Sequence, residues 1–301
     1  MITKDKFGVY DRYTLKNDVL EVSFINLGAT LVSLKYKGQE RAVCYQTAEA
    51  ALEGSGFLCK TVGRYANRIG NSAFDLAGKH YVLPANEGKN QLHGGPDSYD
   101  KRIWDASCDG DELTFTIASP DGDNGYPGNL VMKITFTLEA SAVKAVFRAT
   151  TDATTVFAPT VHPYFNLGGT DNVHEAKLQI AAAGHLEADE GLIPTGKVLP
   201  CEGRFDFTSL REIGEDFDDC FVTPDDFCCA LEMGGCRMEM YTDMPAIQIY
   251  TGQGLGAPYT PNYGIAIEPE FFPDSPNHPD FPSTVLQPGE EYESYVIYKF
   301  I

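Results

Sequence analysis

The sequence lacks any apolar run close to the roughly 20 residues that a membrane-spanning helix needs, and its first residues lack the apolar core of a secretion signal. Basic residues are also scarce, because 23 lysines and arginines stand against 43 acidic residues and leave a formal net charge of −20. Such a charge repels phosphate backbones and anionic lipids. We therefore expect a soluble, cytoplasmic protein without nucleic-acid or membrane partners.

The cysteines lack the spacing of a zinc motif or of a compact disulfide framework, although there are eight of them and two, Cys228 and Cys229, are adjacent. This usage predicts free thiols in a reducing compartment. The acidic loop from 120 to 128 has Asp121 and Asp123 but lacks the glycine and glutamate spacing of an EF-hand. We therefore expect no calcium site there.

Long helical patterns are nearly absent, and the only helical stretch, residues 47 to 53, is two turns at most. Alternation with a period of two dominates instead, for example in the runs 130 to 138 and 246 to 250. The chain of 301 residues is long enough for two domains, yet β-sandwiches often exceed 200 residues as one unit. We expect an all-β protein, a large antiparallel β-sandwich with very little helix, forming a single domain over residues 1–301.

The stretch from Thr160 to Gly169 contains His162 between apolar residues and ends with two glycines. Histidine is the side chain whose ordinary pKa lies closest to neutrality, so it suits proton transfer. Its best partner is Glu268, which interrupts the apolar run 265 to 270. The pattern fits an acid and base pair, although spacing alone favours a hydrogen-bonded core histidine and a salt-bridged carboxylate.

Other polar groups in glycine-rich segments are candidates for binding a polyhydroxylated ligand. Asn67 and Arg68 lie in the segment Gly63–Gly70, and their forks of donors suit vicinal hydroxyls, although Arg68 equally suits a surface ion pair. His93 precedes two glycines that allow close approach to a ligand. Two adjacent carboxylates, Asp218 and Asp219, indicate either one poised carboxyl or a solvated acidic turn.

Taken in order, these segments resemble the aldose 1-epimerase (galactose mutarotase) family from the first strands to the last. The resemblance is carried by ordered motifs, which are Gly63-Arg64 with Ala66-Asn67-Arg68-Ile69, Leu92-His93-Gly94-Gly95 with Asp100-Lys101 and Trp104, His162 with Tyr164-Phe165-Asn166-Leu167, Asp218 with Phe221, Gln248 with Tyr250-Thr251-Gly252, Glu268-Pro269 with Pro273-Asp274 and Asn277, and Leu286 with Pro288-Gly289-Glu290. Each motif alone is weak, but the ordered set is specific.

The resemblance implies a galactose mutarotase-like supersandwich whose groove binds a free aldose, with no metal and no organic cofactor. It further implies that His162 is the general acid, that Glu268 is the general base and that His93 assists near the ring oxygen. The substrate-binding residues implied by the resemblance are Asn67, Arg68, Tyr164, Asp218 and Gln248. Three positions depart from the family pattern, namely Pro163, Asp219 and Glu270, and the last two are expected to add negative charge near the groove.

The implied reaction interconverts the α and β anomers of free hexoses such as galactose and glucose by opening and reclosing the ring. A base removes the proton of the C1 hydroxyl while an acid protonates the ring oxygen. We expect nearby carboxylates to raise the pKa of His162, and the charge of the histidine to keep Glu268 ionised. An aromatic side chain, Tyr164 or Phe271, is expected to cover the apolar face of the sugar.

Four other readings stay open at this point. His93, His162 and Glu268 match a metal site with two histidines and one carboxylate. Asp218 and Glu268 match the paired carboxylates of a glycosidase. The chain would otherwise be a sugar-binding β-sandwich module without catalysis, or an anomerase of sugar phosphates. The expected partner is a small monosaccharide, and a homodimer is possible for a chain of this kind.

Overall fold

The computed structural model describes residues 1–301, which form three large antiparallel sheets and four two-stranded ones. The helical elements are α1 (Ala48–Glu53) and six 3₁₀ turns, η1 (Gly70–Ser72), η2 (Tyr99–Lys101), η3 (Asp123–Gly125), η4 (Val173–Glu175), η5 (Gly203–Phe205) and η6 (Ser275–Asn277). Thr47 caps α1 by accepting the backbone N–H of Ala50. The expected short helix and the expected all-β class are thus confirmed. None of the helices has the length and apolarity needed to cross a bilayer.

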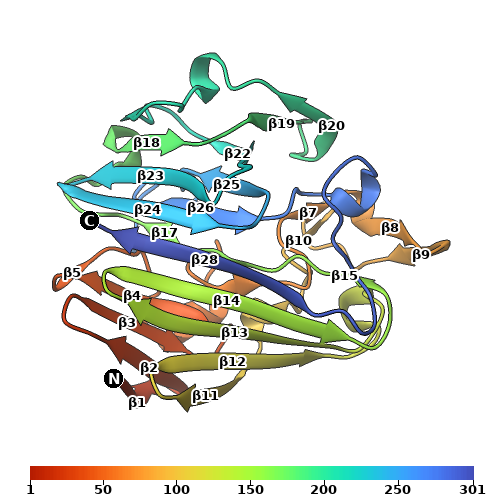
Figure 1. The fold of residues 1–301 in the computed structure, drawn as a ribbon, viewed down its shortest axis with the longest axis horizontal. Coiled ribbons are helices and arrows are strands. Elements are labelled where there is room, and N and C mark those ends of the chain that lie inside the picture. The colour runs from red at the N-terminus through yellow and green to blue at the C-terminus, as the bar shows by residue number, and fades with distance from the viewer.

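The largest sheet has nine strands, and in Figure 1 it extends from β11 at the bottom to β18 near the top. In spatial order its strands are β11 (Asp105–Asp109), β12 (Glu112–Ser119), β13 (Leu130–Glu139), β14 (Ala142–Thr151), β28 (Tyr292–Phe300), β24 (Cys236–Thr242), β23 (Phe227–Met233), β18 (Lys177–Ile180) and β21 (Arg211–Glu212). Strand β13 shows why these segments fold as strands, because its residues alternate between buried and exposed along most of its length. The chain returns to this sheet at its end, where β28 pairs with both β14 and β24.

A five-stranded sheet contains the N-terminal strands and packs on one half of the nine-stranded sheet. Its strands are β1 (Ile2–Phe7), β2 (Tyr10–Lys16), β3 (Leu20–Ile25), β4 (Thr30–Tyr36) and β5 (Gln39–Glu40). Phe24 of β3 stacks on Phe136 of β13, with ring centroids 4.0 Å apart. Tyr13 of β2 meets Phe115 of β12 edge to face at 5.9 Å. These contacts close one half of the sandwich.

A six-stranded sheet packs on the other half of the nine-stranded sheet. Its strands in spatial order are β17 (Tyr164–Phe165), β26 (Ile265–Glu270), β25 (Ala246–Tyr250), β22 (Asp218–Val222), β19 (Gly184–Ala188) and β20 (Pro194–Leu199). Ile247, Ile249 and Ile267 point from it into a core of 53 buried residues that both halves share. Since side chains alternate along a strand, the residues between these isoleucines face the opposite way. That outer face carries the polar residues described below.

The remaining strands form four two-stranded ribbons. They are β10 (Gln91–Leu92) with β7 (Arg68–Ile69), β15 (Thr155–Val156) with β27 (Val285–Leu286), β16 (Thr160–Val161) with β6 (Thr61–Val62), and β8 (Ala73–Leu76) with β9 (Lys79–Val82). The β10–β7 and β16–β6 ribbons bring the His93 and His162 segments toward the six-stranded sheet. They therefore position the candidate functional residues.

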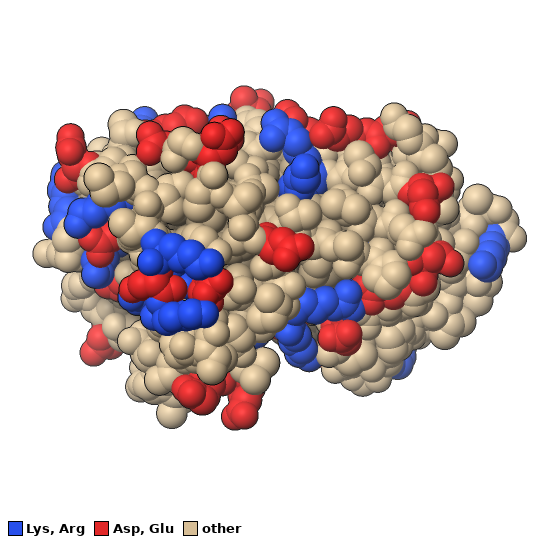
Figure 2. Space-filling view, turned by 90° about the horizontal axis from the view of Figure 1, so that it is seen from below, with Lys and Arg blue, Asp and Glu red and all other residues tan.

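The ion pairs on the surface are mostly local. Lys4 and Lys6 both pair with Asp11, and Arg12 pairs with Asp5, so the β1–β2 hairpin neutralises much of its own positive charge. Figure 2 shows acidic and basic side chains intermingled on one face of the molecule.

Candidate active site

Glu268 lies at the centre of the outer face of the six-stranded sheet. It stands opposite Gln248 of β25, which in turn stands opposite Cys220 of β22. Gln248 donates its side-chain N–H to Asp218 Oδ1 at 2.7 Å. Strand alternation thus places Glu268, Gln248 and Asp218 on one face, and the pairing of the three strands brings them side by side. The reading of Asp218 and Asp219 as a solvated acidic turn is wrong, because they begin β22 and are only partly exposed.

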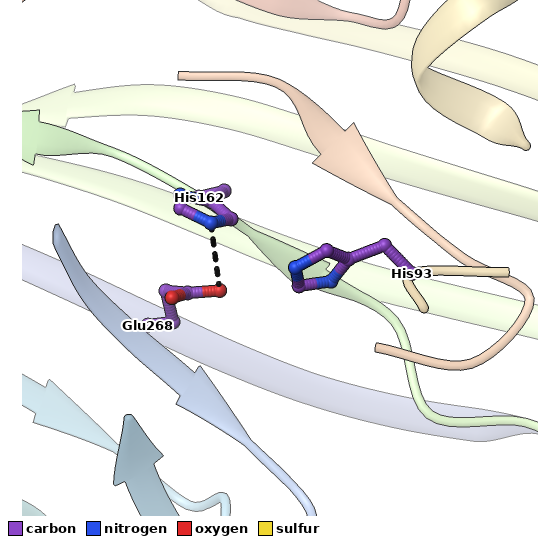
Figure 3. Close-up of side chains that lie close together, drawn as sticks. All are labelled: His93, His162 and Glu268. Atoms are coloured by element: carbon purple, nitrogen blue, oxygen red, sulfur yellow. Dashed lines mark ion pairs between the residues drawn. The ribbon is translucent and has the colours of Figure 1, made fainter. Parts of the chain in front are cut away.

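His162 reaches Glu268 from the turn between β16 and β17. Its backbone N–H donates to Lys60 O at 2.9 Å, and its carbonyl accepts the Cys59 N–H at 2.9 Å, so the backbone of this turn is fixed on both sides. The imidazole Nε2 lies 3.4 Å from Glu268 Oε2 (Figure 3). Both side chains are almost fully buried, with 6% and 3% exposed. Residues far apart in the sequence therefore meet as the predicted pair.

Aromatic rings hold the imidazole of His162. Tyr164 stacks on it at a centroid distance of 5.0 Å, and Phe57 stacks on it at 6.0 Å. Burial among these rings lowers the pKa of His162 to about 3. The expectation that nearby carboxylates raise this pKa is wrong, because the loss of hydration around the ring outweighs any favourable charge. The imidazole alone is neutral at physiological pH.

The pKa of Glu268 is raised well above its usual range, first by burial and then by the charges of Glu270 and Asp218, while Arg68 opposes the shift. The expectation was that the charge of the histidine keeps Glu268 ionised, whereas the surroundings shift its pKa in the opposite direction. The lowered pKa of His162 favours loss of its proton, and the raised pKa of Glu268 favours retention of a proton. Neutral His162 beside protonated Glu268 and an imidazolium beside a carboxylate differ only in which residue carries the proton.

His93 approaches from the segment after β10 with a positive φ of 50°. Its Nδ1 lies 3.1 Å from the Asn67 backbone N–H and accepts that hydrogen bond, which leaves the proton of the neutral ring on Nε2. Burial lowers the pKa of His93 well below its usual value, and the charges of His162 and Arg68 add to the shift. His93 is thus a fixed neutral donor beside the pair (Figure 3).

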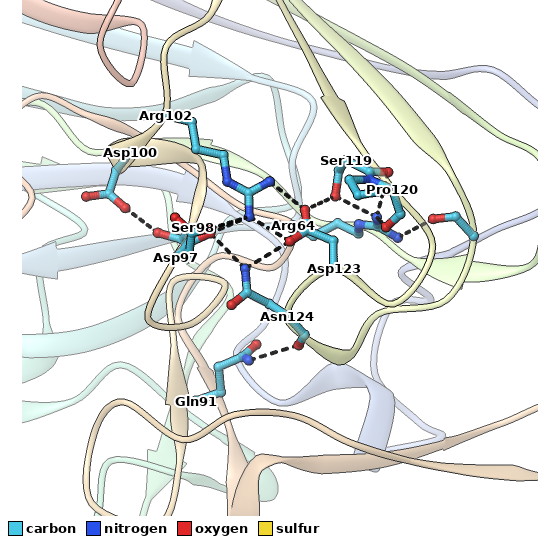
Figure 4. A network of polar contacts seen from close by, with 11 residues as sticks. Arg64, Gln91, Asp97, Ser98, Asp100, Arg102, Ser119, Pro120, Asp123 and Asn124 are labelled. Atoms are coloured by element: carbon cyan, nitrogen blue, oxygen red, sulfur yellow. Dashed lines mark hydrogen bonds and ion pairs between the residues drawn. The ribbon is translucent and has the colours of Figure 1, made fainter.

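The next residue after His93 must be a glycine. A Cβ on Gly94 would lie 2.0 Å from the carbonyl oxygen of Gly63, so the two backbones touch. Arg64 anchors that second backbone, because its buried guanidinium donates to the carbonyls of Ser119 and Pro127, among others (Figure 4). The loop from 119 to 128, tied in this way, also accepts a hydrogen bond from Gln91 through Asn124 O. The Gly63-Arg64 and His93-Gly94 motifs therefore interlock.

Asn67 and Arg68 form the opposite wall. Asn67 donates from Nδ2 to Glu270 Oε1 at 2.9 Å and accepts the Arg68 backbone N–H at its own Oδ1. Arg68 is held by Glu87 through two contacts of 2.7 and 2.8 Å, the bidentate arrangement that fixes a guanidinium plane. The reading of Arg68 as an ion-paired residue is thus also correct, and the pairing orients it toward the site.

The eight predicted site residues line a single hollow of about 200 Å³. They are His93, His162, Glu268, Asn67, Arg68, Tyr164, Asp218 and Gln248, and the remaining lining residues are Gly56, Phe57, Leu92 and Tyr250. Phe271 does not line the hollow and instead packs toward Tyr292, so its expected role as the aromatic cover is wrong. Phe57, which the sequence reasoning missed, takes that place. The sequence Gly54-Ser55-Gly56-Phe57 could have indicated this role, because glycines allow the backbone to come close to a bound ligand.

The three departures from the family pattern have different surroundings. Asp219 lies outside the lining of the hollow, where its carboxylate is 3.6 Å from Arg204 and accepts the Asp218 backbone N–H at 3.3 Å. Burial raises the pKa of Glu270 to about 8. The charge of Glu270 raises the pKa of Glu268, and the charge of Asp219 raises the pKa of Asp218, so both departures act on the carboxyls of the groove as negative charges, as expected. The carbonyl of Pro163 accepts the backbone N–H of Ile267 at 3.4 Å and ties the His162 turn to β26.

His93, His162 and Glu268 could also accept a metal ion, because each offers a ligand atom and these atoms lie within 4.8 Å of one another. Two imidazoles and one carboxylate suit a divalent transition metal. The Nδ1 of His93 is already an acceptor for Asn67, so only its Nε2 is free for such a role, and that atom would have to lose its proton.

Known proteins and a family model match this chain over almost its whole length. The family described as aldose 1-epimerase matches residues 11–299. Galactose mutarotase of Mus musculus is 34% identical, with 97% of this chain and 94% of the mouse protein aligned. Aldose 1-epimerase of Escherichia coli K12 is 36% identical, with 97% and 95% aligned.

Solved structures give the same answer. Galactose 1-epimerase from Lactobacillus acidophilus superposes with a TM-score of 0.90 at 28% identity, covering 100% of this chain and 98% of that one. An aldose epimerase homologue from C. elegans superposes with a TM-score of 0.92 at 28% identity, covering 96% and 98%. The galactose mutarotase-like fold expected for this chain is therefore confirmed.

Proposed function

This chain belongs to the aldose 1-epimerase family, and from that premise we propose that it interconverts the α and β anomers of free hexoses, galactose and glucose among them. It is an isomerase of the mutarotase type. The observation that carries the assignment of residues is the 3.4 Å approach of His162 Nε2 to Glu268 Oε2 at the floor of a hollow lined by all the expected binding residues.

Ring opening needs a base at the C1 hydroxyl and an acid at the ring oxygen. In the reactive state Glu268 is a carboxylate and His162 an imidazolium, which is the single-proton state of the pair with the proton on the imidazole. Glu268 takes the proton of the C1 hydroxyl, the C1 oxygen forms the aldehyde, and the bond from C1 to the ring oxygen breaks. His162 gives its proton to that ring oxygen. Rotation about the C1–C2 bond and the reverse proton transfers close the ring on the other face of the aldehyde.

The other residues orient the sugar. The Nε2–H of His93 is a donor for the ring oxygen or a neighbouring hydroxyl, because its Nδ1 is occupied by the Asn67 N–H. Asp218, Gln248, Asn67 and Arg68 offer acceptors and donors for hydroxyls along one side. Tyr164 and Phe57 offer aromatic faces to the C–H face of the ring. Fixing the ring in this way supplies the positional part of the rate enhancement.

Polarimetry of freshly dissolved α-glucose and α-galactose tests this proposal. The parent protein is expected to accelerate the approach to the anomeric equilibrium, and Glu268→Gln is expected to lose about 10²- to 10⁴-fold of kcat, the usual share of general acid and base catalysis. Asp219→Asn is the matched control, because it changes a carboxyl outside the hollow and should retain activity. Gln248→Glu does not serve as a control, because it adds a charge inside the hollow. Full activity of a folded Glu268→Gln variant would refute the assignment.

The organisation of the chain is part of the same proposal. A core of 53 buried residues with members from β2 to β28 supports one domain over residues 1–301. Eight free cysteines, most of them buried, support a reducing cytoplasmic location. The partner is a free monosaccharide, and sedimentation analysis would test for a homodimer.

A further inference from the structure

Arg68 is the only lysine or arginine among the residues that line the catalytic hollow. The two histidines of the hollow, His93 and His162, have lowered pKa values because they are buried. A guanidinium, by contrast, stays charged throughout the physiological pH range. Arg68 therefore carries the one permanent positive charge at these walls, and such a charge attracts anionic ligands unless another group compensates it.

Glu87 compensates this charge from outside the hollow, because it is not among the lining residues. Its two carboxylate oxygens accept hydrogen bonds from Nε and Nη2 of Arg68 at 2.7 and 2.8 Å. The remaining nitrogen, Nη1, has only a long contact of 3.5 Å to Asn67 Oδ1. Arg68 thus keeps one nitrogen for a sugar hydroxyl, while the fork of donors that suits a carboxylate or a phosphate is already occupied.

The loop that carries Glu87 is fixed to the ribbon that carries Arg68. Glu87 and Asn90 exchange two backbone hydrogen bonds, of 3.1 and 2.9 Å, across a tight turn. Asn86 accepts the Leu92 N–H at 2.7 Å and donates from Nδ2 to Leu92 O at 3.0 Å. Leu92 in turn stands opposite Arg68 in the β10–β7 ribbon. The carboxylate of Glu87 therefore has a fixed place beside the guanidinium.

The charge of Glu87 acts inside the hollow. The pKa of Asp218, which lines the hollow, is raised first by burial, and the charge of Arg68 lowers it while the charge of Glu87 raises it. Screening by salt acts over about 8 Å at physiological ionic strength, so these charges reach across a hollow of about 200 Å³. An anionic group in this hollow would meet the carboxyls of Asp218 and Glu268 and a guanidinium whose charge is compensated.

We propose that Glu87 is a specificity-determining residue, which restricts the substrates to uncharged aldoses by occupying the carboxylate-binding fork of Arg68 and compensating its charge. Glu87 acts through Arg68 and does not touch the sugar. The inference rests on the proposed function, because it concerns which sugars the catalytic hollow accepts. It disfavours sugar acids as substrates, and it disfavours the reading of the chain as an anomerase of sugar phosphates on the same ground.

Galactose and galacturonate provide a matched test, because they differ only in the carboxylate that replaces the C6 hydroxymethyl group. Polarimetry starting from the α anomers would give kcat and KM for both sugars with the parent, Glu87→Gln and Asp5→Asn. The parent should favour galactose in kcat/KM by roughly tenfold or more, and Glu87→Gln should reduce this preference by roughly tenfold through a lower KM for galacturonate. For galactose, Glu87→Gln should raise KM by about two- to threefold, because Arg68 is held less firmly, with kcat near that of the parent.

Asp5→Asn is the matched control. Asp5 accepts hydrogen bonds from the same two nitrogens of an arginine, Arg12, and no residue of the β1–β2 hairpin lines the catalytic hollow. This variant removes the same charge from the chain and should leave the preference for galactose unchanged. Molar salt should reduce the gain of Glu87→Gln on galacturonate, because screening weakens the attraction to Arg68.

An unchanged preference in Glu87→Gln would overturn the inference, and so would an equal change in Asp5→Asn, because the overall charge would then be responsible. An equal loss on both sugars would also overturn it, since Glu87 would then act only through the fold.

Calorimetric binding separates this inference from the proposed function. Glu87→Gln should bind galacturonate more tightly than the parent does, whether or not either protein accelerates anomerisation. A parent that accelerates neither sugar would refute the proposed function. In that case a gain in affinity for galacturonate would still support the role of Glu87, and an unchanged affinity would overturn it.

Discussion

The two faces of the six-stranded sheet differ in chemistry although the same strands form both. On the inner face Ile247, Ile249 and Ile267 are fully buried in the shared core. On the outer face Gln248 and Glu268 alternate with them and line the hollow. Gln248 and Glu268 are also buried, so burial itself does not distinguish the two faces. Burial of apolar side chains on the inner face stabilises the fold. Burial of ionisable groups on the outer face shifts their pKa values instead.

The largest effect is expected on the outer side of this comparison. His162→Asn removes the group that protonates the ring oxygen while keeping a polar side chain of smaller volume. We expect kcat to fall by about 10²- to 10⁴-fold with little change in the free energy of unfolding. Polarimetry and urea denaturation of the same preparation would measure both quantities. Activity within a factor of two of the parent would contradict the assigned role.

The inner face should show the opposite behaviour. Ile249→Ala deletes a fully buried side chain from the core and is expected to cost about 2–5 kcal/mol of unfolding free energy. The hollow on the other face keeps its polar groups, so kcat of the folded fraction should stay near that of the parent. Ile249→Val is the matched milder change, expected to cost about 0.5–1.5 kcal/mol. A large loss of kcat in the folded variant would mean that the two faces are coupled.

Substitution of Glu270 measures how much unfolding free energy the protein loses when a buried carboxyl of the outer face ionises. Its pKa is about 8 in the folded protein against 4.5 for an unperturbed glutamate. The folded state therefore holds this proton more tightly, so the stability that Glu270 contributes is fully present below pH 4.5 and is lost as the pH rises through about 8. Glu270→Gln keeps an acceptor for Asn67 but cannot ionise.

This variant should weaken the decline in stability between those two pH values. The gain over the parent should be largest at the alkaline end, of the order of a few kcal/mol for a shift of this size, and should shrink toward pH 4.5. Urea denaturation across the pH range would measure it. Parallel pH curves for the parent and Glu270→Gln would show that this carboxyl does not titrate as described.

The smallest effect is expected from chelation. His93, His162 and Glu268 lie close enough to bind a metal, but the proposed reaction moves only protons between these residues and the sugar. Exhaustive dialysis against a chelator should leave kcat unchanged. Loss of activity that an added divalent metal restores would favour the metal site over the proton-transfer pair.

Much of the fold could be predicted because it depends on local patterns. The alternation in residues 130 to 138 specified a strand, and the alanine-rich stretch from 47 to 53 specified the short helix. The meeting of His162 with Glu268 could not come from such patterns, since strand pairing between distant segments decides it. The resemblance to a family provided it instead.

The features that sequence reasoning missed depend on surroundings that a sequence does not display. Burial reverses the direction expected for the pKa of His162, and no local pattern reveals how many rings surround a histidine. Glu87 holds Arg68 from a loop without any motif, and Phe57 reaches the imidazole only because the segment 54–58 folds back over it. Asp218 looked like part of a turn because its strand begins with two charged residues.

The single proton shared by His162 and Glu268 has a consequence for how the protein responds to its medium. One proton enters the pair from the sugar as another leaves it, so the total charge of the hollow is the same before and after each ring opening, and the hexose is uncharged. Screening by salt should therefore change the rate of ring opening little, even though the chain carries a formal charge of −20. Turnover of neutral sugars should be nearly the same in dilute buffer and in molar salt.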